Sequence, residues 1–320
     1  RNLALKNNIL GISPNGWSFK AENIDYNKLK DEITSTTGVT VINDERGLTI
    51  SGQNFTTDSK MSYIELEKDV TLEDKNIILK GDKGNYDDLS KIVILSDNIK
   101  LEGKGENQGV IDGNFKTLRY NMESKILEAW EPFDAIYKGV KLSAESLYFK
   151  EDTETLKISK NVVIEVNGFK INVTRLDKGA NSDILNIVGK IKGSNGVYSF
   201  VGDGGMYNTQ SKVLTITGNI VGTSTKGEKI TGEKLVYDSN TQLLTLSGKK
   251  DVRYSSADGE LVTKSFTYNN ATKELVTDGS YSFIGPKYES KGKKFYFNDT
   301  TKDIKITDGY ILDKSKEQKL

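Results

Sequence analysis

The sequence predicts an all-β protein built from repeated two-stranded units, and three observations support this prediction. Glycine is frequent (30 of 320 residues) and proline rare (3), while 15 tyrosines and 11 phenylalanines suit strands and tight turns better than helices. Apolar and polar residues alternate over short runs such as 243–248. The same pattern returns about every 30 residues, which is the mark of a repeat architecture. We therefore expect about ten units stacked into an elongated sheet array.

The repeat is clearest in three segments, Tyr207–Gly218, Tyr237–Gly248 and Tyr268–Gly279. Each reads as an aromatic anchor, a polar turn, an alternating strand and a glycine. Extending this register along the chain gives ten anchors that lie 29 to 34 residues apart, and the residue seven positions later is aliphatic in nine of the ten units. The anchors are Tyr26, Phe55, Tyr86, Tyr120, Phe149, Lys178, Tyr207, Tyr237, Tyr268 and Phe297.

Each unit is expected to contain one strand that runs into the anchor and one that leaves the turn. Residues 232–237 and 243–248 illustrate the two strands, and the turn between them contains Asp238–Thr241, whose side-chain oxygens can hydrogen-bond the nearby backbone. A glycine recurs after the second strand, where a positive φ or a bulge would let the strand bend. These glycines are Gly189, Gly218, Gly248 and Gly279.

The domain organisation predicted from the repeat is a lead segment over residues 1–24, a single continuous β-repeat domain over 25–312 and a frayed tail over 313–320. Two stretches also fit helical spacing. For 118–130 the match to the repeat favours strand, whereas for 25–37 helix and strand both remain open.

Composition excludes several classes of function. The 45 basic and 45 acidic side chains cancel, which argues against a protein that binds nucleic acid or an anionic membrane by charge. The absence of cysteine and histidine excludes disulfides, thiol nucleophiles, Cys/His zinc sites and imidazole bases. No run approaches the roughly 20 apolar residues that span a bilayer. We predict no catalytic residues, no metal site and no cofactor; a glycosidase with paired carboxylates ranks last, because nothing marks a pair.

The signature Tyr-[Asn/Asp]-x-x-[Thr/Ser]-x-x-Leu-x-[Ile/Leu]-x-Gly resembles the repeat of the periplasmic lipopolysaccharide transport proteins, the LptA and LptC components of the OstA-like family. The match is strongest over residues 205–279 and weakens toward the N terminus. The resemblance implies an open β-jelly-roll, a folded-over sheet with an apolar groove that shields lipopolysaccharide acyl chains. It also implies a periplasmic location, end-to-end docking through terminal edge strands, and an inner-membrane ABC transporter as partner. Two alternatives stay open: a longer anchor-type subunit, whose N-terminal membrane helix would have been removed before Arg1, and a fusion of bridge-like modules.

An apolar sheet face must be covered by another layer or by a ligand, and this choice separates two hypotheses. In a lipid carrier the face lines a groove, whereas in a surface or adhesive β-solenoid it forms a dry core. For the groove we predict that Leu214, Ile216, Leu244 and Leu246 point inward with Tyr237 and Tyr268 opposite, while Thr215 and Thr245 face water. The full set of candidate lipid-binding residues is Leu185, Ile187, Leu214, Ile216, Leu235, Tyr237, Leu244, Leu246, Phe266, Tyr268 and Leu275.

Overall fold

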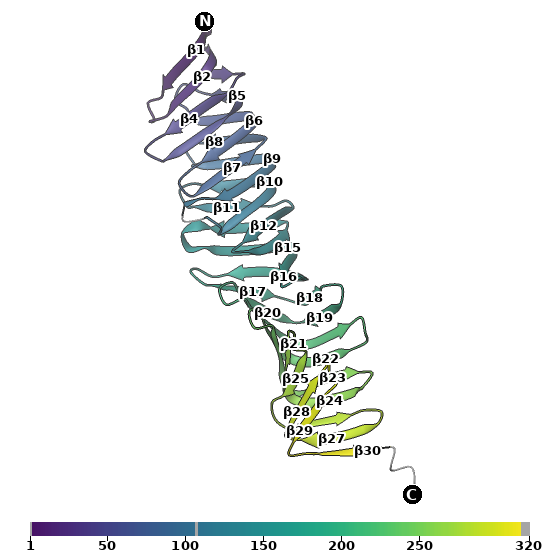
Figure 1. The fold of residues 1–320 in the computed structure, drawn as a ribbon. Helices are drawn as coiled ribbons and strands as arrows, with labels where there is room; N and C mark the ends of the chain where they lie inside the picture. Colours follow the sequence, from purple (N-terminus) through teal and green to yellow (C-terminus); the bar gives the residue numbers. More distant parts are fainter. Residues whose placement is uncertain (1, 106–107, 315–320) are drawn as a thin grey trace. The chain divides into compact units, whose positions relative to one another are not determined.

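The computed structural model describes residues 2–105 and 108–314, and the chain divides into two compact units. Unit one comprises residues 1–162 and 179–181, and unit two comprises 163–178 and 182–320. Both consist of antiparallel strands joined by short turns (Figure 1). No α-helix occurs among the described residues, although a short 3-10 turn, η2, covers Glu151–Thr153. The predicted all-β fold class is confirmed.

Unit one contains short strands and longer ones of ten to twelve residues. Its strands are β1 (Asn2–Ile12), β2 (Ser18–Asn27), β3 (Glu32–Ser35), β4 (Val39–Asn43), β5 (Leu48–Thr57), β6 (Tyr63–Glu73), β7 (Ile77–Gly81), β8 (Lys83–Asp87), β9 (Ile92–Gly103), β10 (Ile111–Asn121), β11 (Ile126–Ala129), β12 (Phe133–Tyr137), β13 (Val140–Ala144) and β14 (Ser146–Lys150). The next strand, β15 (Thr155–Val166), begins in unit one and ends in unit two.

Unit two repeats the same alternation of short and long strands. They are β16 (Phe169–Lys178), β17 (Ile184–Val188), β18 (Ile191–Ser194), β19 (Tyr198–Gly202), β20 (Gly204–Asn208), β21 (Val213–Ser224), β22 (Lys229–Asp238), β23 (Leu243–Ser256), β24 (Gly259–Asn269), β25 (Glu274–Thr277), β26 (Tyr281–Ile284), β27 (Tyr288–Gly292), β28 (Lys294–Asn298), β29 (Ile304–Thr307) and β30 (Tyr310–Asp313).

The long strands bend at their middle and contribute to two sheet layers. In β21 the half 213–217 pairs with β20 and the half 221–224 pairs with β19. The pairing of β21 with β22 shifts between Thr217 and Ile220, which is where the strand bends. We call the layer that holds the anchors the anchor layer and the other the facing layer. The bends form the corner, and the turns at the opposite ends of both layers form the open side.

Within each unit the two layers pack through their inner faces. In unit one the rings of Tyr137, from the facing layer, and Phe149, from the anchor layer, lie 6.2 Å apart. In unit two Tyr281 and Phe295 meet in the same way at 5.1 Å. Gly232 lies so close to Leu246 of the anchor layer that an added Cβ would be 2.9 Å from its side chain. Each unit therefore has a packed core next to its corner.

A hydrogen bond across the corner recurs at a fixed separation of 16 residues. The Asn98 amide donates to Asp82 at 2.6 Å, and the Asn219 amide donates to Asp203 at 2.6 Å. Asn98 and Asn219 have positive φ angles of 50° and 36°. The amide of Asn161 donates to Glu145 in the same arrangement. Asparagine suits this place because it tolerates the left-handed conformation and also carries a donor.

Several sequence predictions can be compared directly with the strands. Residues 25–37 and 118–130, which also fit helical spacing, contain the ends of β2 and β10, a turn, and the strands β3 and β11, so both stretches are strand hairpins and not helices. Three of the four recurring glycines, Gly189, Gly218 and Gly279, have positive φ; Gly248 does not and lies beside a register shift in β23. The predicted lead segment 1–24 contains β1 and most of β2.

Two predictions about organisation stay predictions. One is that residues 25–312 form a single continuous repeat domain. The chain divides into two compact units, and this division does not test whether they form one domain. The other is a frayed tail over 313–320, of which 315–320 lie outside the described residues.

Candidate functional site

The eleven candidate lipid-binding residues all lie on the inner face of the anchor layer in unit two, in two parallel rows. Antiparallel pairing places each residue directly beside the next one in its row. The row nearer the open side contains Leu185, Tyr207, Leu214, Tyr237, Leu244, Tyr268 and Leu275. The row nearer the corner contains Ile187, Gly205, Ile216, Leu235, Leu246 and Phe266.

One part of the predicted arrangement is wrong. Tyr237 and Tyr268 do not lie opposite the leucines on the other side of a groove. Tyr237 pairs directly with Leu214 and Leu244, and Tyr268 pairs with Leu244 and Leu275, all within the anchor layer. The reason is that the strand entering an anchor and the strand leaving its turn form one hairpin, so the two residues become cross-strand partners on one face. Thr215 and Thr245 point to the other face, as predicted, but are half-buried.

The side chains that do lie opposite come from the facing layer and were missed by the sequence analysis. Ile220, Val252 and Leu261 are buried there, while Ile230 and Tyr254 are half-buried. The signal that could have found them is the alternation that resumes after each bend, as in Val252–Tyr254. The inner surface of unit two therefore has two walls, of which only one was predicted.

Burial differs between the two rows of the anchor layer. Next to the corner, Ile216, Leu246 and Phe266 are at most 2% exposed. In the row nearer the open side, Leu185, Tyr207, Leu214 and Leu275 are also at most 4% exposed, whereas Tyr237, Leu244, Tyr268 and the next anchor, Phe297, are half-buried. These partly exposed side chains form a strip that water reaches, interrupted by the buried Leu275 between Tyr268 and Phe297. We call Tyr237, Leu244, Tyr268 and Phe297, with Ile230 and Tyr254 from the facing layer, the exposed strip.

At the exposed strip, burial and nearby carboxylates stabilise the neutral forms of Tyr254 and Tyr268. The Tyr254 hydroxyl donates to Glu228 at 3.3 Å, and both burial and the Glu228 charge raise the pKa of Tyr254. Burial, followed by the charge of Asp299, raises the pKa of Tyr268 to about 12. The phenols therefore stay uncharged near neutral pH, so each offers an apolar ring with one polar tip. Such side chains suit the boundary between an apolar ligand and water.

Between residues 184 and 312, no polar contact closes the open side of unit two. Within residues 184–312, which the structure describes throughout, no hydrogen bond or ion pair joins the anchor layer to the facing layer across that side. The Tyr254–Glu228 bond stays within the facing layer, and Lys302 pairs with Asp299 in its own turn at 2.6 Å. Separation of the two layers at this side would therefore break apolar contacts but no polar ones.

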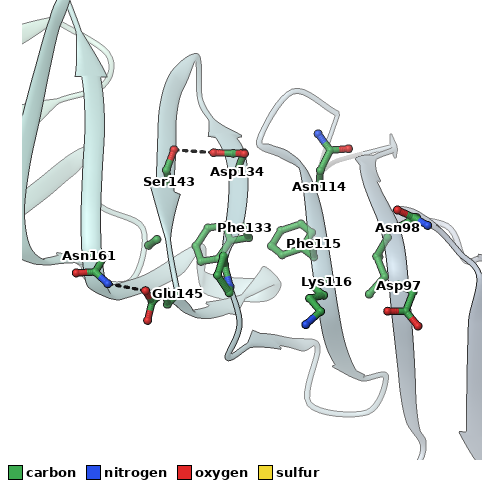
Figure 2. A pocket seen from close by; sticks show the side chains of 13 residues that line it. Asp97, Asn98, Asn114, Phe115, Lys116, Phe133, Asp134, Ser143, Glu145 and Asn161 are labelled. Atoms are coloured by element: carbon green, nitrogen blue, oxygen red, sulfur yellow. Dashed lines mark hydrogen bonds between the residues drawn. The ribbon is translucent and has the colours of Figure 1, made fainter.

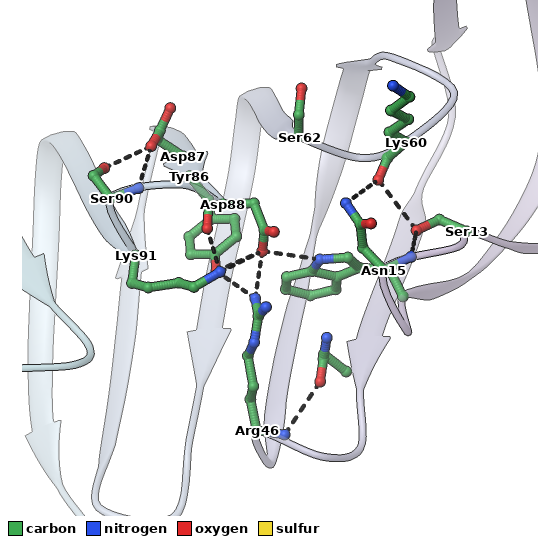
Figure 3. Close-up of polar contacts among 12 residues, drawn as sticks. Ser13, Asn15, Arg46, Lys60, Ser62, Tyr86, Asp87, Asp88, Ser90 and Lys91 are labelled. Carbon is green, nitrogen blue, oxygen red and sulfur yellow. Dashed lines mark hydrogen bonds and ion pairs between the residues drawn. The ribbon is translucent and has the colours of Figure 1, made fainter.

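In unit one four of the five anchors are covered, whereas the first, Tyr26, is half-buried. The anchors Phe55, Tyr86, Tyr120 and Phe149 are at most 2% exposed. The cover over Tyr86 is a polar cluster that joins the two layers (Figure 3). Trp17, from the turn between β1 and β2, is fully buried and packs edge-on against the Tyr86 ring at 5.3 Å.

The polar part of this cluster is centred on Asp88, in the turn after β8. Its carboxylate accepts from Trp17 Nε1 at 3.2 Å, from the Tyr86 hydroxyl at 3.1 Å and from the Arg46 guanidinium. The Lys91 ammonium lies 3.3 Å away. Burial alone would raise the pKa of Asp88, but the hydrogen bonds from Arg46, Tyr86 and Trp17 outweigh it and lower that pKa. Asp88 is therefore charged at neutral pH. We call these five residues the Asp88 clasp.

A second cluster closes the open side further along unit one. The Tyr120 hydroxyl, from the anchor layer, donates to Asp74 at 3.0 Å, in the turn between β6 and β7 of the facing layer. Lys125 Nζ lies 3.4 Å from the same carboxylate oxygen. Asn76 donates to Glu151 at 3.2 Å. Tyr120 is 0% exposed and Asp74 is 3% exposed, so this Asp74 clasp is a buried polar connection.

A separate hollow of about 710 Å³ lies at the corner of unit one (Figure 2). Its floor is formed by Phe115 and Phe133, whose rings stack 5.2 Å apart and are each 4% exposed. The polar side chains around it pair with one another or with neighbours, namely Ser143 with Asp134, Asn161 with Glu145 and Lys116 with Glu131. The hollow lies where the chain leaves β11 and enters β12, and these hydrogen bonds and the ion pair surround it.

Neither a metal cluster nor a membrane-spanning helix is present in the described part of the chain. Among residues 2–105 and 108–314, no group of three or more acidic side chains is arranged to hold a metal ion. Over the same ranges, no helix has the length and apolar character needed to cross a bilayer.

Comparison with known proteins gave one kind of match. No protein-family description matches the chain, and no curated protein is similar to it in sequence. Among solved structures, the chain is similar to LptH from Pseudomonas aeruginosa, described as the LptA-homologous periplasmic component of the lipopolysaccharide transport device. The match has 16% identity and a TM-score of 0.32, and it covers 35% of this chain and 82% of LptH. At this TM-score we base no functional argument on the likeness.

Proposed function

We propose that the chain is a non-catalytic lipid-transport scaffold whose exposed strip in unit two shields the acyl chains of lipopolysaccharide or a similar amphiphile. The observation that supports this most directly is the line of half-buried Tyr237, Leu244, Tyr268 and Phe297 along an open side that no polar contact closes. The repeat signature supports it independently, because it resembles that of periplasmic lipopolysaccharide transport proteins. From the same resemblance we propose a periplasmic location and end-to-end docking with related proteins.

The energetics are compatible with such a ligand. Burial of one CH₂ group stabilises by about 0.8 kcal/mol, so a chain of ~14 carbons gains roughly 11 kcal/mol before ordering costs. A scaffold that releases this ligand must pass it to a site of similar depth or use energy from a partner. We propose an inner-membrane ABC transporter as that partner. The chain itself contains no G-x-x-x-x-G-K-[ST] motif that would bind a nucleotide phosphate.

A second candidate function, a surface or adhesive β-solenoid with a dry core, is favoured by a different observation. Near the corner both units are filled by side chains, with Leu246 of unit two and Leu118 of unit one each 0% exposed. If unit two also stays closed to ligands in solution, its exposed strip is only a poorly covered edge of that core.

Photo-crosslinking in a Gram-negative host distinguishes the two functions. A light-activated amino acid is placed at Leu244, on the exposed strip, or at Thr245, which is also half-buried but points to the outer face. A lipid carrier gives a lipopolysaccharide adduct at Leu244 and none at Thr245. No adduct at either position, in folded protein of normal abundance, would favour the dry-core solenoid. Equal adducts at both would contradict the inner-face assignment.

A further inference from the structure

The two units close their open sides differently although they share one repeat. In unit one, Trp17, Arg46 and Asp74 lie in turns of the facing layer. Trp17 and Arg46 hydrogen-bond to Asp88 of the anchor layer, and Asp74 accepts from Tyr120 of the same layer. In unit two, Tyr237 and Tyr268 at the same anchor position are half-buried, whereas Tyr207 is 4% exposed. The difference does not come from Lys91 or Asp88 alone, since Lys302 and Asp299 occupy the same places after the anchor Phe297. It comes from Trp17 and Arg46, because unit two contains no tryptophan and has no arginine in its turns.

We propose that the Asp88 and Asp74 clasps exclude acyl chains from unit one and so confine the lipid compartment to unit two, with Asp88 as the residue that determines this boundary. This inference rests on the proposed function, since it specifies where on the chain the ligand binds. Asp88 acts by positioning other side chains and does not itself contact the ligand.

The first reason why an acyl chain is excluded from unit one is that the Trp17 side chain occupies the space that the chain would need. The Trp17 indole is fully buried and covers the Tyr86 ring. The Arg46 guanidinium lies 5.5 Å from the centre of the indole, at cation–π distance. An acyl chain could reach the inner face here only by displacing the indole. That would uncover a large apolar surface and break the bond from Trp17 Nε1 to Asp88.

The second reason is the ion pair between Asp88 and Arg46. A methylene chain next to Asp88 and Arg46 would take water from an ion pair and return no hydrogen bond, which is costly. In unit two, charged groups also lie near the exposed strip: Glu228 accepts from Tyr254, and Lys302, which pairs with Asp299, lies 5.5 Å from the centre of the Phe297 ring. Each of these contacts stays within one layer, and the tips of Tyr254 and Tyr268 can keep their contact with water while their rings cover a chain. To reach the inner face of unit one, an acyl chain would therefore have to break an ion cluster that joins the two layers, whereas in unit two the ions beside the strip stay within their own layers.

Asp88 holds the cluster together because several donors from both layers converge on its carboxylate. Its backbone N–H is itself fixed by a bond to Ser62 O at 2.8 Å. Replacement by alanine leaves the Arg46 guanidinium and the Trp17 N–H without this acceptor, which favours conformations in which the indole moves outward. The neighbouring Asp87 provides a matched control, because it is exposed and accepts from Ser90 and Leu89 of its own turn.

The test uses the purified full chain with a palmitic acid that carries a diazirine, and maps the adducts by mass spectrometry. We expect wild-type adducts within residues 184–312 and not within 17–160. Asp88→Ala should raise labelling within 17–160 by about tenfold, the factor expected for loss of a charged acceptor, whereas Asp87→Ala should not. Equal labelling of both regions in the wild type, or no gain in Asp88→Ala, would overturn the inference.

A second readout needs no ligand and separates failure of this inference from failure of the proposed function. The chain has two tryptophans, Trp17, which is buried, and Trp130, which is 46% exposed. In a Trp130→Phe background, Asp88→Ala should increase acrylamide quenching of Trp17 several-fold, while Asp87→Ala leaves it unchanged. If quenching increases but no region is labelled by palmitic acid in any variant, the clasp is real and the lipid function is wrong. If quenching does not change, the role of Asp88 is wrong.

Discussion

Unit one and unit two place the same anchor residue in different surroundings. Tyr86 and Tyr120 are buried beneath polar clusters, whereas Tyr237 and Tyr268 line an open side. The strands, their pairing and the inward direction of the anchor are alike in both units. What differs is a small set of turn residues, above all Trp17, that unit one has and unit two lacks.

This difference shows that fold and accessibility have separate causes in the molecule. Alternation along the strands determines which face is apolar. The turns then determine whether that face is covered at its open side. A repeat protein can therefore present a dry core and an accessible strip within one chain, and turn substitutions can convert one into the other without altering a strand.

The largest difference between the units should follow removal of a clasp carboxylate. Asp74→Ala removes a 3% exposed acceptor of the Tyr120 hydroxyl and of the backbone N–H groups of Asn76 and Ile77. We expect unit one to lose about 3–5 kcal/mol of unfolding free energy, the range for breaking a buried polar pair. Glu228→Ala, the corresponding change in unit two, should cost within about 1 kcal/mol. Urea unfolding measures both, and similar losses would contradict the contrast between closed and open sides.

A smaller effect should follow overpacking at the corner of unit two. In Gly232→Ala the new Cβ would lie 2.9 Å from Leu246 side-chain atoms, and in Gly202→Ala it would lie 2.4 Å from Ile216. We expect each to lose about 1–3 kcal/mol of unfolding free energy, because this core is packed. Gly38→Ala is the control, since the methyl group it adds would have no neighbouring atom within 4 Å. Full tolerance of both corner substitutions would mean that unit two is loosely packed throughout.

Much of the fold could be predicted from the sequence, because period-two alternation and a 30-residue repeat are local signals. They placed Leu214, Leu244 and Leu275 on one face correctly. The position of Tyr237 was assigned wrongly because alternation gives the face of a residue but not its partner, which depends on hairpin register.

The clasps could not be predicted for a different reason. Trp17 and Asp88 are 71 residues apart, and Asp74 and Tyr120 are 46 apart, neither of which is a multiple of the repeat. By contrast, the corner hydrogen bond between Asn98 and Asp82 has an equivalent between Asn219 and Asp203 with the same separation of 16 residues, so this pair of residues is a pattern that the sequence contains more than once. Contacts that follow a period are visible in a sequence, whereas contacts made once by turns are visible only in the fold.

Acid should open unit one before unit two. The pKa of Asp88 is lowered in the folded chain, so its contribution to stability is present above the unfolded pKa of about 3.9 and is lost as pH falls through the folded value. Below about pH 4 we expect the Trp17 emission of a Trp130→Phe variant to shift toward that of exposed indole while the strand signal in circular dichroism persists. Asp88→Asn should abolish this separate step. A shift that coincides with global unfolding would show that the clasp does not open on its own.

The smallest effect concerns the phenols of the exposed strip at alkaline pH. The pKa of Tyr268 is raised to about 12, and an unfolded tyrosine titrates near 10, so its contribution to stability is lost as pH rises between these values. A bound acyl chain would remove more water from Tyr268 and raise its pKa further, but would leave the fully buried Tyr120 unchanged. Tyrosinate absorbance of the wild type and Tyr268→Phe, each with and without palmitic acid, measures this. A ligand-dependent shift that persists in Tyr268→Phe would place the ligand away from the exposed strip and remove the difference in accessibility between the two units.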